Sequence, residues 1–286
     1  MKKIIISVSL LFFSYAVFAG GGWPQPKGSG YVKLSEWWLI ANQHYTDAGR
    51  IDPNLTNGIF NTTVYLEYGL SDRLTAIIYS PIFSRSYTNN EVSGTTGEIL
   101  TPGEAINSIG DTDISIKYGL TKPGKIAISA TLTLGLPLGR SSGGTLGNLQ
   151  TGDGEFNQLI QIDAGTGFKL GEVNAYANVY VGVNNRTNDF SDEFRYGIEG
   201  GITLFRNRLT AIARLIGVKS FRNGLPASES NSTSIFANNA EFLSFAPEIA
   251  YNITPNWGIS AGLGAALSGK IIYANTSYNV GVFFRW

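Results

Sequence analysis

Few side chains in this chain could carry out a reaction. His44 is the only histidine, and there is no cysteine. A single histidine can act as a general base beside a serine nucleophile, but the stretch Asn42-Gln43-His44-Tyr45 contains no recognisable nucleophile motif. One histidine without cysteine also excludes a thiolate site and a multi-histidine metal site. We therefore expect no catalytic residue, no metal and no cofactor.

Acidic residues are the remaining candidates for binding a cation. Asp111 and Asp113 are spaced like two ligands of a calcium loop, but no matching ligand set follows them. Asp153, Asp189 and Asp192 lie in polar stretches of the chain. All five are expected to be solvated loop carboxylates rather than calcium ligands.

The elements that position the polar side chains are predicted to be β-strands. At the end of the chain, apolar residues occupy every second position: Tyr278, Val280, Val282, Phe284 and Trp286. This period of two is typical of a strand with one apolar and one polar face. The stretch Tyr278–Trp286 also resembles the terminal aromatic signal of bacterial outer-membrane barrels. That resemblance implies recognition by the barrel-assembly machinery.

Residues 1–19 are predicted to be a secretory signal peptide. Lys2 and Lys3 precede the apolar stretch Ile4–Phe18, which is too short to span a bilayer, and cleavage is expected after Ala19. Without the two lysines the chain carries 19 basic and 21 acidic residues. This near-neutral balance gives no reason to expect nucleic acid as a partner.

The rest of the chain is expected to be one barrel preceded by a short segment. Residues 20–29 contain glycines and prolines that exclude a strand interior, so they are predicted to be a periplasmic lead-in or a short plug. Residues 30–286 contain no apolar run long enough for a transmembrane helix. In the first strand Leu34 and Glu36 share a face, which predicts a bulge near Glu36.

Short and long connections alternate along residues 30–286. The short ones are rich in turn formers: Ser71–Arg73, Thr121–Gly124, Gly171–Glu172, Arg206–Arg208 and Thr254–Asn256. The long ones are 44–58, 88–110, 140–156, 185–193, 222–240 and 273–276. Up-and-down membrane barrels have short periplasmic turns and long external loops. We therefore predict an all-β, antiparallel transmembrane barrel of about twelve strands, surrounded by lipid in the outer membrane of a Gram-negative bacterium.

The strand period also predicts which side chains face the lumen. Charged groups on the lipid face would cost about 2–4 kcal/mol near the midplane, so they are assigned to the interior. They are Glu67, Lys117, Asp163, Arg195, Glu199, Arg214, Glu248 and Arg285, and Tyr176 and Tyr180 share the inward face. Opposite charges are expected to pair across the narrow interior. They would either line a thin pathway or fill the interior as a structural network.

Two features predict how a solute could enter or leave. Pro81 lies inside a predicted wall strand and has no amide hydrogen for the ladder. It predicts either a lateral opening to lipid or a β-bulge without an opening. Pro247 also lies inside a predicted wall strand and likewise lacks an amide hydrogen for the ladder. Among the long loops, at least one of 88–110, 140–156 and 222–240 is expected to fold over the outer mouth.

Short motifs in the chain resemble one family of outer-membrane proteins. The stretch Gly110–Tyr118 begins Gly-Asp-Thr-Asp and ends Lys-Tyr, and Thr133–Gly139 ends Leu-Pro-Leu-Gly. The stretch Trp23–Tyr31 is also similar to starts in this family, which consists of transporters named after the meta-cleavage pathway of phenol degradation. The resemblance implies a channel for passive transport of small molecules, with aromatic or other hydrophobic compounds as solutes.

Two other functions stay open at this point. A twelve-stranded barrel can be an outer-membrane enzyme of the phospholipase type, although His44 is expected to be a solvated loop histidine. A structural or adhesive surface barrel is the second alternative. Conductance in a planar bilayer would favour a pore, and lipid hydrolysis without conductance would favour an enzyme.

Overall fold

The computed structural model describes residues 21–52, 56–121, 124–225 and 234–286. The predicted signal peptide therefore lies outside the described residues. All eighteen regular elements of the described chain are β-strands. No helix in these ranges has the length and apolarity needed to cross a membrane.

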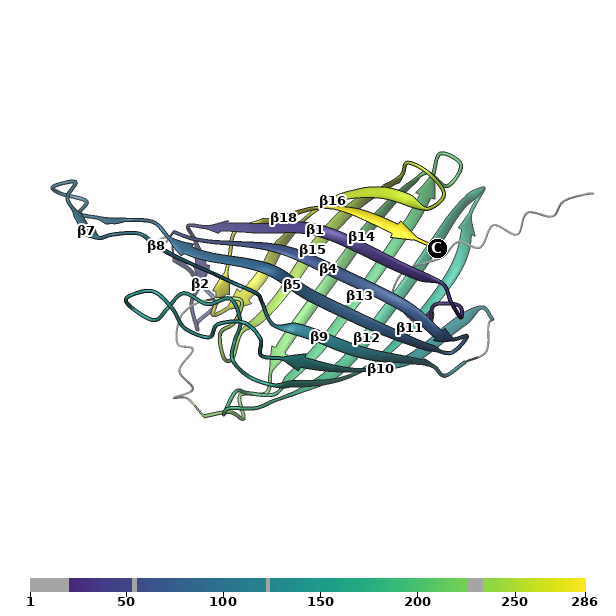
Figure 1. The fold of residues 1–286 in the computed structure, drawn as a ribbon, viewed down its shortest axis with the longest axis horizontal. Coiled ribbons are helices and arrows are strands. Elements are labelled where there is room, and N and C mark those ends of the chain that lie inside the picture. Colours follow the sequence, from purple (N-terminus) through teal and green to yellow (C-terminus); the bar gives the residue numbers. More distant parts are fainter. Residues whose placement is uncertain (1–20, 53–55, 122–123, 226–233) are drawn as a thin grey trace, which may run out of the picture.

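Thirteen of the strands form one antiparallel sheet that closes on itself (Figure 1). They are β1 (Gly30–Ala41), β4 (Asn57–Ser71), β5 (Leu74–Thr88), β8 (Glu104–Ser108), β9 (Thr112–Gly119), β10 (Ile126–Leu136), β11 (Asn157–Leu170), β12 (Val173–Arg186), β13 (Glu193–Leu204), β14 (Leu209–Ser220), β15 (Glu241–Asn252), β16 (Trp257–Lys270) and β18 (Ser277–Arg285). β8 and β9 pair with successive parts of β5 and occupy one position in the wall. The last strand pairs with the first, so the predicted closed barrel of twelve strand positions is confirmed.

Five short strands lie outside the main sheet, at the end of the barrel opposite the short turns. β2 (His44–Tyr45), β3 (Ile51–Asp52) and β17 (Ile272–Tyr273) form a small sheet, and β6 (Glu91–Val92) pairs with β7 (Ile99–Thr101). The β6–β7 hairpin projects beyond the wall (Figure 1). The predicted loop 88–110 is therefore too long, because wall pairing resumes at Glu104 through β8.

The strand period separates an outward and an inward face throughout the wall. On β18 the outward Val280 and Val282 are 45% and 46% exposed, whereas the inward Phe283 is 5% exposed. Exposed apolar residues continue along β9 to β12, as at Ile116 and Ile160. An apolar outer surface around a closed ladder is the pattern of a barrel in lipid. The protein is accordingly an integral barrel of the Gram-negative outer membrane.

The outward face contains one carboxyl group near the middle of β1. β1 pairs with β4 and β18 without a register shift, so the bulge predicted near Glu36 is wrong. Glu36 stays on the outward face with the exposed Leu34. Its Oε2 accepts a hydrogen bond from Thr62 Oγ1 at 2.8 Å, on the neighbouring strand. The cross-strand hydroxyl gives the carboxyl a polar partner, which removes the need for a bulge.

The double variant Glu36→Leu with Thr62→Val should be more stable than the wild type by about 1–2 kcal/mol, because two polar groups leave the lipid-facing surface. Urea titration of the barrel folded into phospholipid vesicles measures this difference. The inward neighbours Ser35 and Thr63, which share a hydrogen bond of 2.9 Å, provide the matched control. Ser35→Ala with Thr63→Val should not stabilise the barrel. A less stable outward variant would show that Glu36 does not face lipid.

Candidate functional site

An ion-pair network crosses the inward faces of β13, β14 and β15. Arg214 on β14 forms salt bridges with Glu199 on β13 and with Glu248 on β15, the latter with an Nη1–Oε2 distance of 2.7 Å. Lys33 on β1 approaches the other oxygen of Glu248 at 2.7 Å. The Tyr176 hydroxyl donates to Glu199 Oε1 at 2.8 Å. The predicted charges therefore do meet, but mainly between neighbouring strands and along one side of the interior.

Two further predicted residues lie beside this network. Arg195 approaches Glu193, two residues before it on β13, with an Nη2–Oε2 distance of 2.8 Å. The side chain of Arg195 remains 35% exposed. The Tyr180 ring lies over Gly197, where a Cβ atom would collide with it. A glycine on β13 thus makes room for an aromatic ring on the inward face of β12.

Arg285 lies at the end of the barrel that carries the short turns. Its Nε donates to the Pro255 carbonyl at 2.9 Å, and its Nη2 donates to Asn252 Oδ1. The guanidinium also lies 5.8 Å from the centroid of the Phe283 ring. These contacts hold the last short turn against β18, so Arg285 belongs to the rim at the short turns and not to the Arg214 network.

Residues 21–29 lie against the inward faces of the strands. Gln25 is 1% exposed, and its Nε2 donates to Glu67 Oε2 at 2.6 Å. Lys117 Nζ donates to the Gly21 carbonyl at 2.8 Å, and the Gly22 amide donates to Asn178 Oδ1 at 3.0 Å. Partners from β4, β9 and β12 thus converge on this segment, which occupies part of the interior near the short turns.

Aromatic packing holds the middle of the same segment. The Trp23 ring meets the Tyr176 ring edge to face, with a centroid distance of 6.4 Å. A Cβ atom at Gly165 would clash with Trp23, so this glycine on β11 is needed for the ring to fit. The strand period places Asn178 on the inward face together with Tyr176 and Tyr180, but the sequence does not identify Trp23 and Gln25 as the residues that contact the wall. Their partners lie far away along the chain, and no local pattern reveals such contacts.

Glu67 and Asp163 are the most enclosed of the predicted charges. Glu67 is fully buried and accepts hydrogen bonds from Gln25 and from the Tyr65 hydroxyl. Asp163 is 3% exposed, and its Oδ1 accepts from Gln161 Nε2 at 3.0 Å. Both carboxyl groups are held by neutral donors, in contrast to the acids of the Arg214 network.

A second charged cluster lies near the outer ends of β12 and β13. Arg186 is surrounded by Asp153, Glu155 and Glu193, at 3.1, 2.6 and 2.8 Å. Burial raises the pKa of Glu155 to about 7, although Arg186 opposes this rise. The cluster fastens segment 137–156 to the wall. The expected folding of a long loop over the outer mouth stays a prediction.

The wall strand at Pro81 is irregular on both sides. Pairing with β4 shifts at Thr62/Thr63, and pairing with β8 and β9 stops between Ser108 and Thr112. The Gly110 amide donates to the Pro81 carbonyl at 2.7 Å and bridges the interruption. Pro81 therefore sits at a β-bulge, next to a discontinuous neighbouring strand. A lateral opening to lipid at this position stays a prediction.

Segment 137–156 takes the place of a strand beside β8. In the described sheet β8 pairs with β5 alone. Thr151 Oγ1 donates to the Ile109 carbonyl at 3.1 Å, and the amides of Gly139 and Asp153 donate to the two oxygens of Asp111 at 2.9 and 2.8 Å. Side chains and loop backbone thus close the wall where the strand ladder ends.

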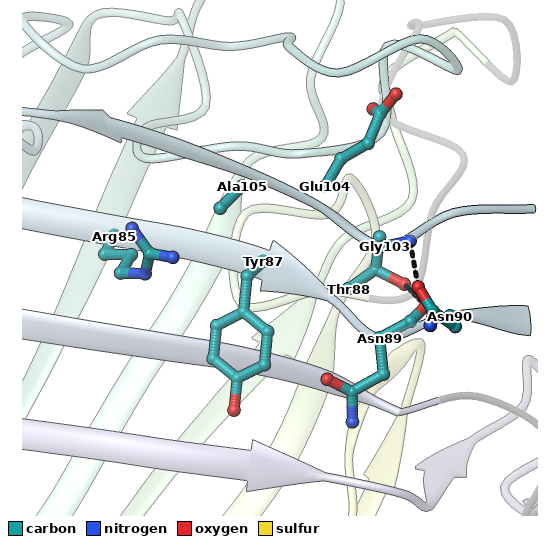
Figure 2. Close-up of a pocket in the computed structure, with 8 residues that line it drawn as sticks. All are labelled: Arg85, Tyr87, Thr88, Asn89, Asn90, Gly103, Glu104 and Ala105. Carbon is teal, nitrogen blue, oxygen red and sulfur yellow. Dashed lines mark hydrogen bonds between the residues drawn. The ribbon is translucent and has the colours of Figure 1, made fainter.

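The remaining candidates lie outside the interior. His44 pairs through its backbone with Tyr273 and Asp52 in the small outer sheet. A polar hollow of about 470 Å³ lies against the outer ends of β5 and β8, where the Gly103 amide donates to Asn90 (Figure 2). Within the described ranges no group of three or more His, Asp or Glu residues could hold a metal ion.

Comparisons with known proteins show the fold but no family. No protein-family model matches the chain, and no curated protein matches its sequence. An outer membrane channel from Pseudomonas putida F1 is 15% identical, with a TM-score of 0.65 over 94% of this chain and 100% of its own. The KdgM porin is 8% identical, with a TM-score of 0.50 over 90% of this chain and 99% of its own. Both similarities show the fold of an outer-membrane barrel.

Removal of the central cation by Arg214→Ala should destabilise the barrel by about 1–3 kcal/mol, because Glu199 and Glu248 lose a partner in a partly buried site. Urea unfolding in vesicles measures the loss. Arg206→Ala, in an exposed short turn, is the control and should change stability by less than about 0.5 kcal/mol. Equal stability of the two variants would mean that the network is not coupled to folding.

Proposed function

We propose that this barrel is a channel for passive transport of small molecules across the outer membrane. The observation that carries the proposal is the inward face, where charged side chains stay partly open to solvent inside a closed wall. Arg195 and Arg214 retain side-chain exposures of 35% and 27%, although both lie on the inward face. Water that reaches these groups provides a route for small polar solutes, whereas a fully packed interior would bury them.

Aromatic solutes fit this interior better than purely aliphatic ones. Tyr31 stacks on Phe283 with a centroid distance of 5.6 Å, and Tyr180 and Tyr176 add further inward rings. Aromatic faces attract other rings and cations, while the neighbouring arginines attract carboxylates and phenolates. The sequence resemblance to transporters of the phenol pathway supports the same class of solute.

Residues 21–29 are proposed to be a plug that narrows the periplasmic half of this route. The segment rests on Glu67, Lys117 and Asn178, which belong to three different parts of the wall. The Trp23 ring and the Gln25 side-chain amide anchor the segment. Their contacts must break before the segment can move out of the interior. Conductance through the barrel should therefore depend on these two side chains.

The double variant Trp23→Ala with Gln25→Ala should raise single-channel conductance several-fold in a planar bilayer, because the plug loses its ring contact and its bond to Glu67. Lys27→Ala is the matched control, since Lys27 contacts the rim through its backbone amide. Unchanged conductance in the double variant would contradict the plug. Absence of any conductance, together with lipid hydrolysis, would favour the enzyme alternative over a channel.

A lateral route to lipid is a second proposal, and the irregular wall beside Pro81 favours it. β8 has one strand partner in the described sheet, and segment 137–156 lies against β8, where the Thr145 amide donates to the Glu104 carboxylate. A loop can move away at lower cost than a strand, because fewer ladder bonds must break. An apolar solute could then leave the interior between β8 and this segment, without crossing the charged outer mouth.

A disulfide between Ile106→Cys and Gly143→Cys should close this route. A Cβ atom at Gly143 would lie 2.8 Å from Ile106 Cγ2, which is close enough for a bridge, and the chain has no other cysteine. The oxidised variant should take up toluene into vesicles more slowly, with normal ion conductance, and reduction should restore uptake. Pro81→Ala, which restores a ladder donor, should also slow uptake. Uptake at the wild-type rate in the oxidised variant would exclude lateral release.

A further inference from the structure

A cluster of three cations lies on the outward face at the outer end of the barrel. Lys219 on β14, Glu241 on β15 and Lys270 on β16 occupy neighbouring positions of adjacent strands, and Arg222 lies two residues after the end of β14. Lys219 Nζ lies 2.5 Å and Lys270 Nζ 3.8 Å from Glu241 Oε2, while Arg222 Nε lies 3.3 Å from Oε1. One carboxylate therefore gathers three cations.

The position of this cluster follows from the strand register. Arg214 faces inward on β14, so Lys219, five residues later, faces outward. Lys270 pairs directly with Glu241 and shares its face. The three residues thus form a row on the lipid side of the wall, at the end far from the short turns.

The cluster carries a net positive charge on exposed side chains. Three cations around one carboxylate leave an excess of two positive charges. The side chains of Lys219, Arg222 and Lys270 are 59%, 50% and 37% exposed, whereas that of Glu241 is 8% exposed. The acid is covered and the cations are presented outward. Asp192, whose carbonyl accepts from the Phe221 amide, has its carboxylate held by Asn185 and Asn223.

An apolar surface lies directly below the cations on the same strands. Leu215 on β14 and Phe245 on β15 are each 38% exposed, and Leu267 on β16 is 57% exposed. Acyl chains pack on such a surface, while phosphate groups at headgroup level attract clustered lysine and arginine. Along the strands toward the outer end, apolar side chains come first and cations follow. This order matches a lipid with acyl chains and a phosphate-bearing headgroup.

We propose that Lys219, Arg222 and Lys270 form a binding site for the phosphate groups of a phosphorylated glycolipid in the outer leaflet. Glu241 offsets one of the three positive charges and is itself shielded, so a lipid phosphate would meet the cations and not the acid. The site is independent of the proposed channel, since it lies on the opposite face of the wall.

Purified barrel in detergent tests this site with diphosphorylated lipid A as the probe and native mass spectrometry as the readout. The triple variant Lys219→Gln, Arg222→Gln and Lys270→Gln should bind at least about tenfold more weakly, since each cation near a headgroup contributes a factor of about five. The triple variant Arg73→Gln, Arg206→Gln and Arg208→Gln removes the same charge from the periplasmic turns and should bind like the wild type. Heat-modifiable gel mobility confirms that each variant is folded.

A fourth variant and two further probes separate the site from a purely structural salt bridge. Glu241→Gln should keep or strengthen lipid A binding, because the positive excess grows; a tenfold loss in the folded variant would contradict binding through the excess positive charge. Lipid A without its phosphates should bind as weakly to the wild type as lipid A does to the first triple variant. Equal binding of both lipids, or full competition by millimolar inorganic phosphate, would overturn the assignment to a lipid.

Discussion

The structure depends on one constraint, which is that lipid offers no hydrogen bonds to the backbone. Each unpaired amide or carbonyl inside a bilayer costs several kcal/mol, so a sheet can cross only if it has no free edge. β1 meets this demand by pairing with β18 from Tyr31 and Arg285 to Leu39 and Ser277. Closure then determines the face of each side chain, because each strand must place alternate residues in lipid and in the interior.

The wall departs from regular strand pairing and from an apolar outer face at a few positions. At Pro81 the ladder is interrupted, and segment 137–156 contributes bonds there from the Thr151 hydroxyl to the Ile109 carbonyl and from the Gly139 amide to the Asp111 carboxylate. Glu36 faces outward because of the strand register, and there Thr62 gives its carboxyl group a hydrogen bond. In the interior the acids divide into two groups: Glu199 and Glu248 meet Arg214, while Glu67 is held by neutral donors next to residues 21–29.

Period-two patterns predicted the fold well, because in a closed barrel the face of a residue depends mainly on its own strand. The parity of β12, β13 and β14 placed Tyr176, Glu199 and Arg214 on one face, and the structure brings them together. Contacts between distant segments could not be predicted in this way. The Gln25–Glu67 bond joins residues 42 positions apart, and β8 is a short strand in a polar stretch that forms only because β5 extends beside it.

The central claim is that the inward face borders water along a path through the membrane. Val179 and Tyr180 are adjacent on β12, with Val179 facing outward and Tyr180 inward, and the chain has no native cysteine. Single-cysteine variants at these two positions can be reacted in vesicles with a charged, membrane-impermeant thiol reagent while conductance is recorded. The account predicts rapid modification and falling conductance for Tyr180→Cys, with Val179→Cys protected by lipid. Protection of both, or modification of Val179→Cys alone, would contradict a water-filled interior.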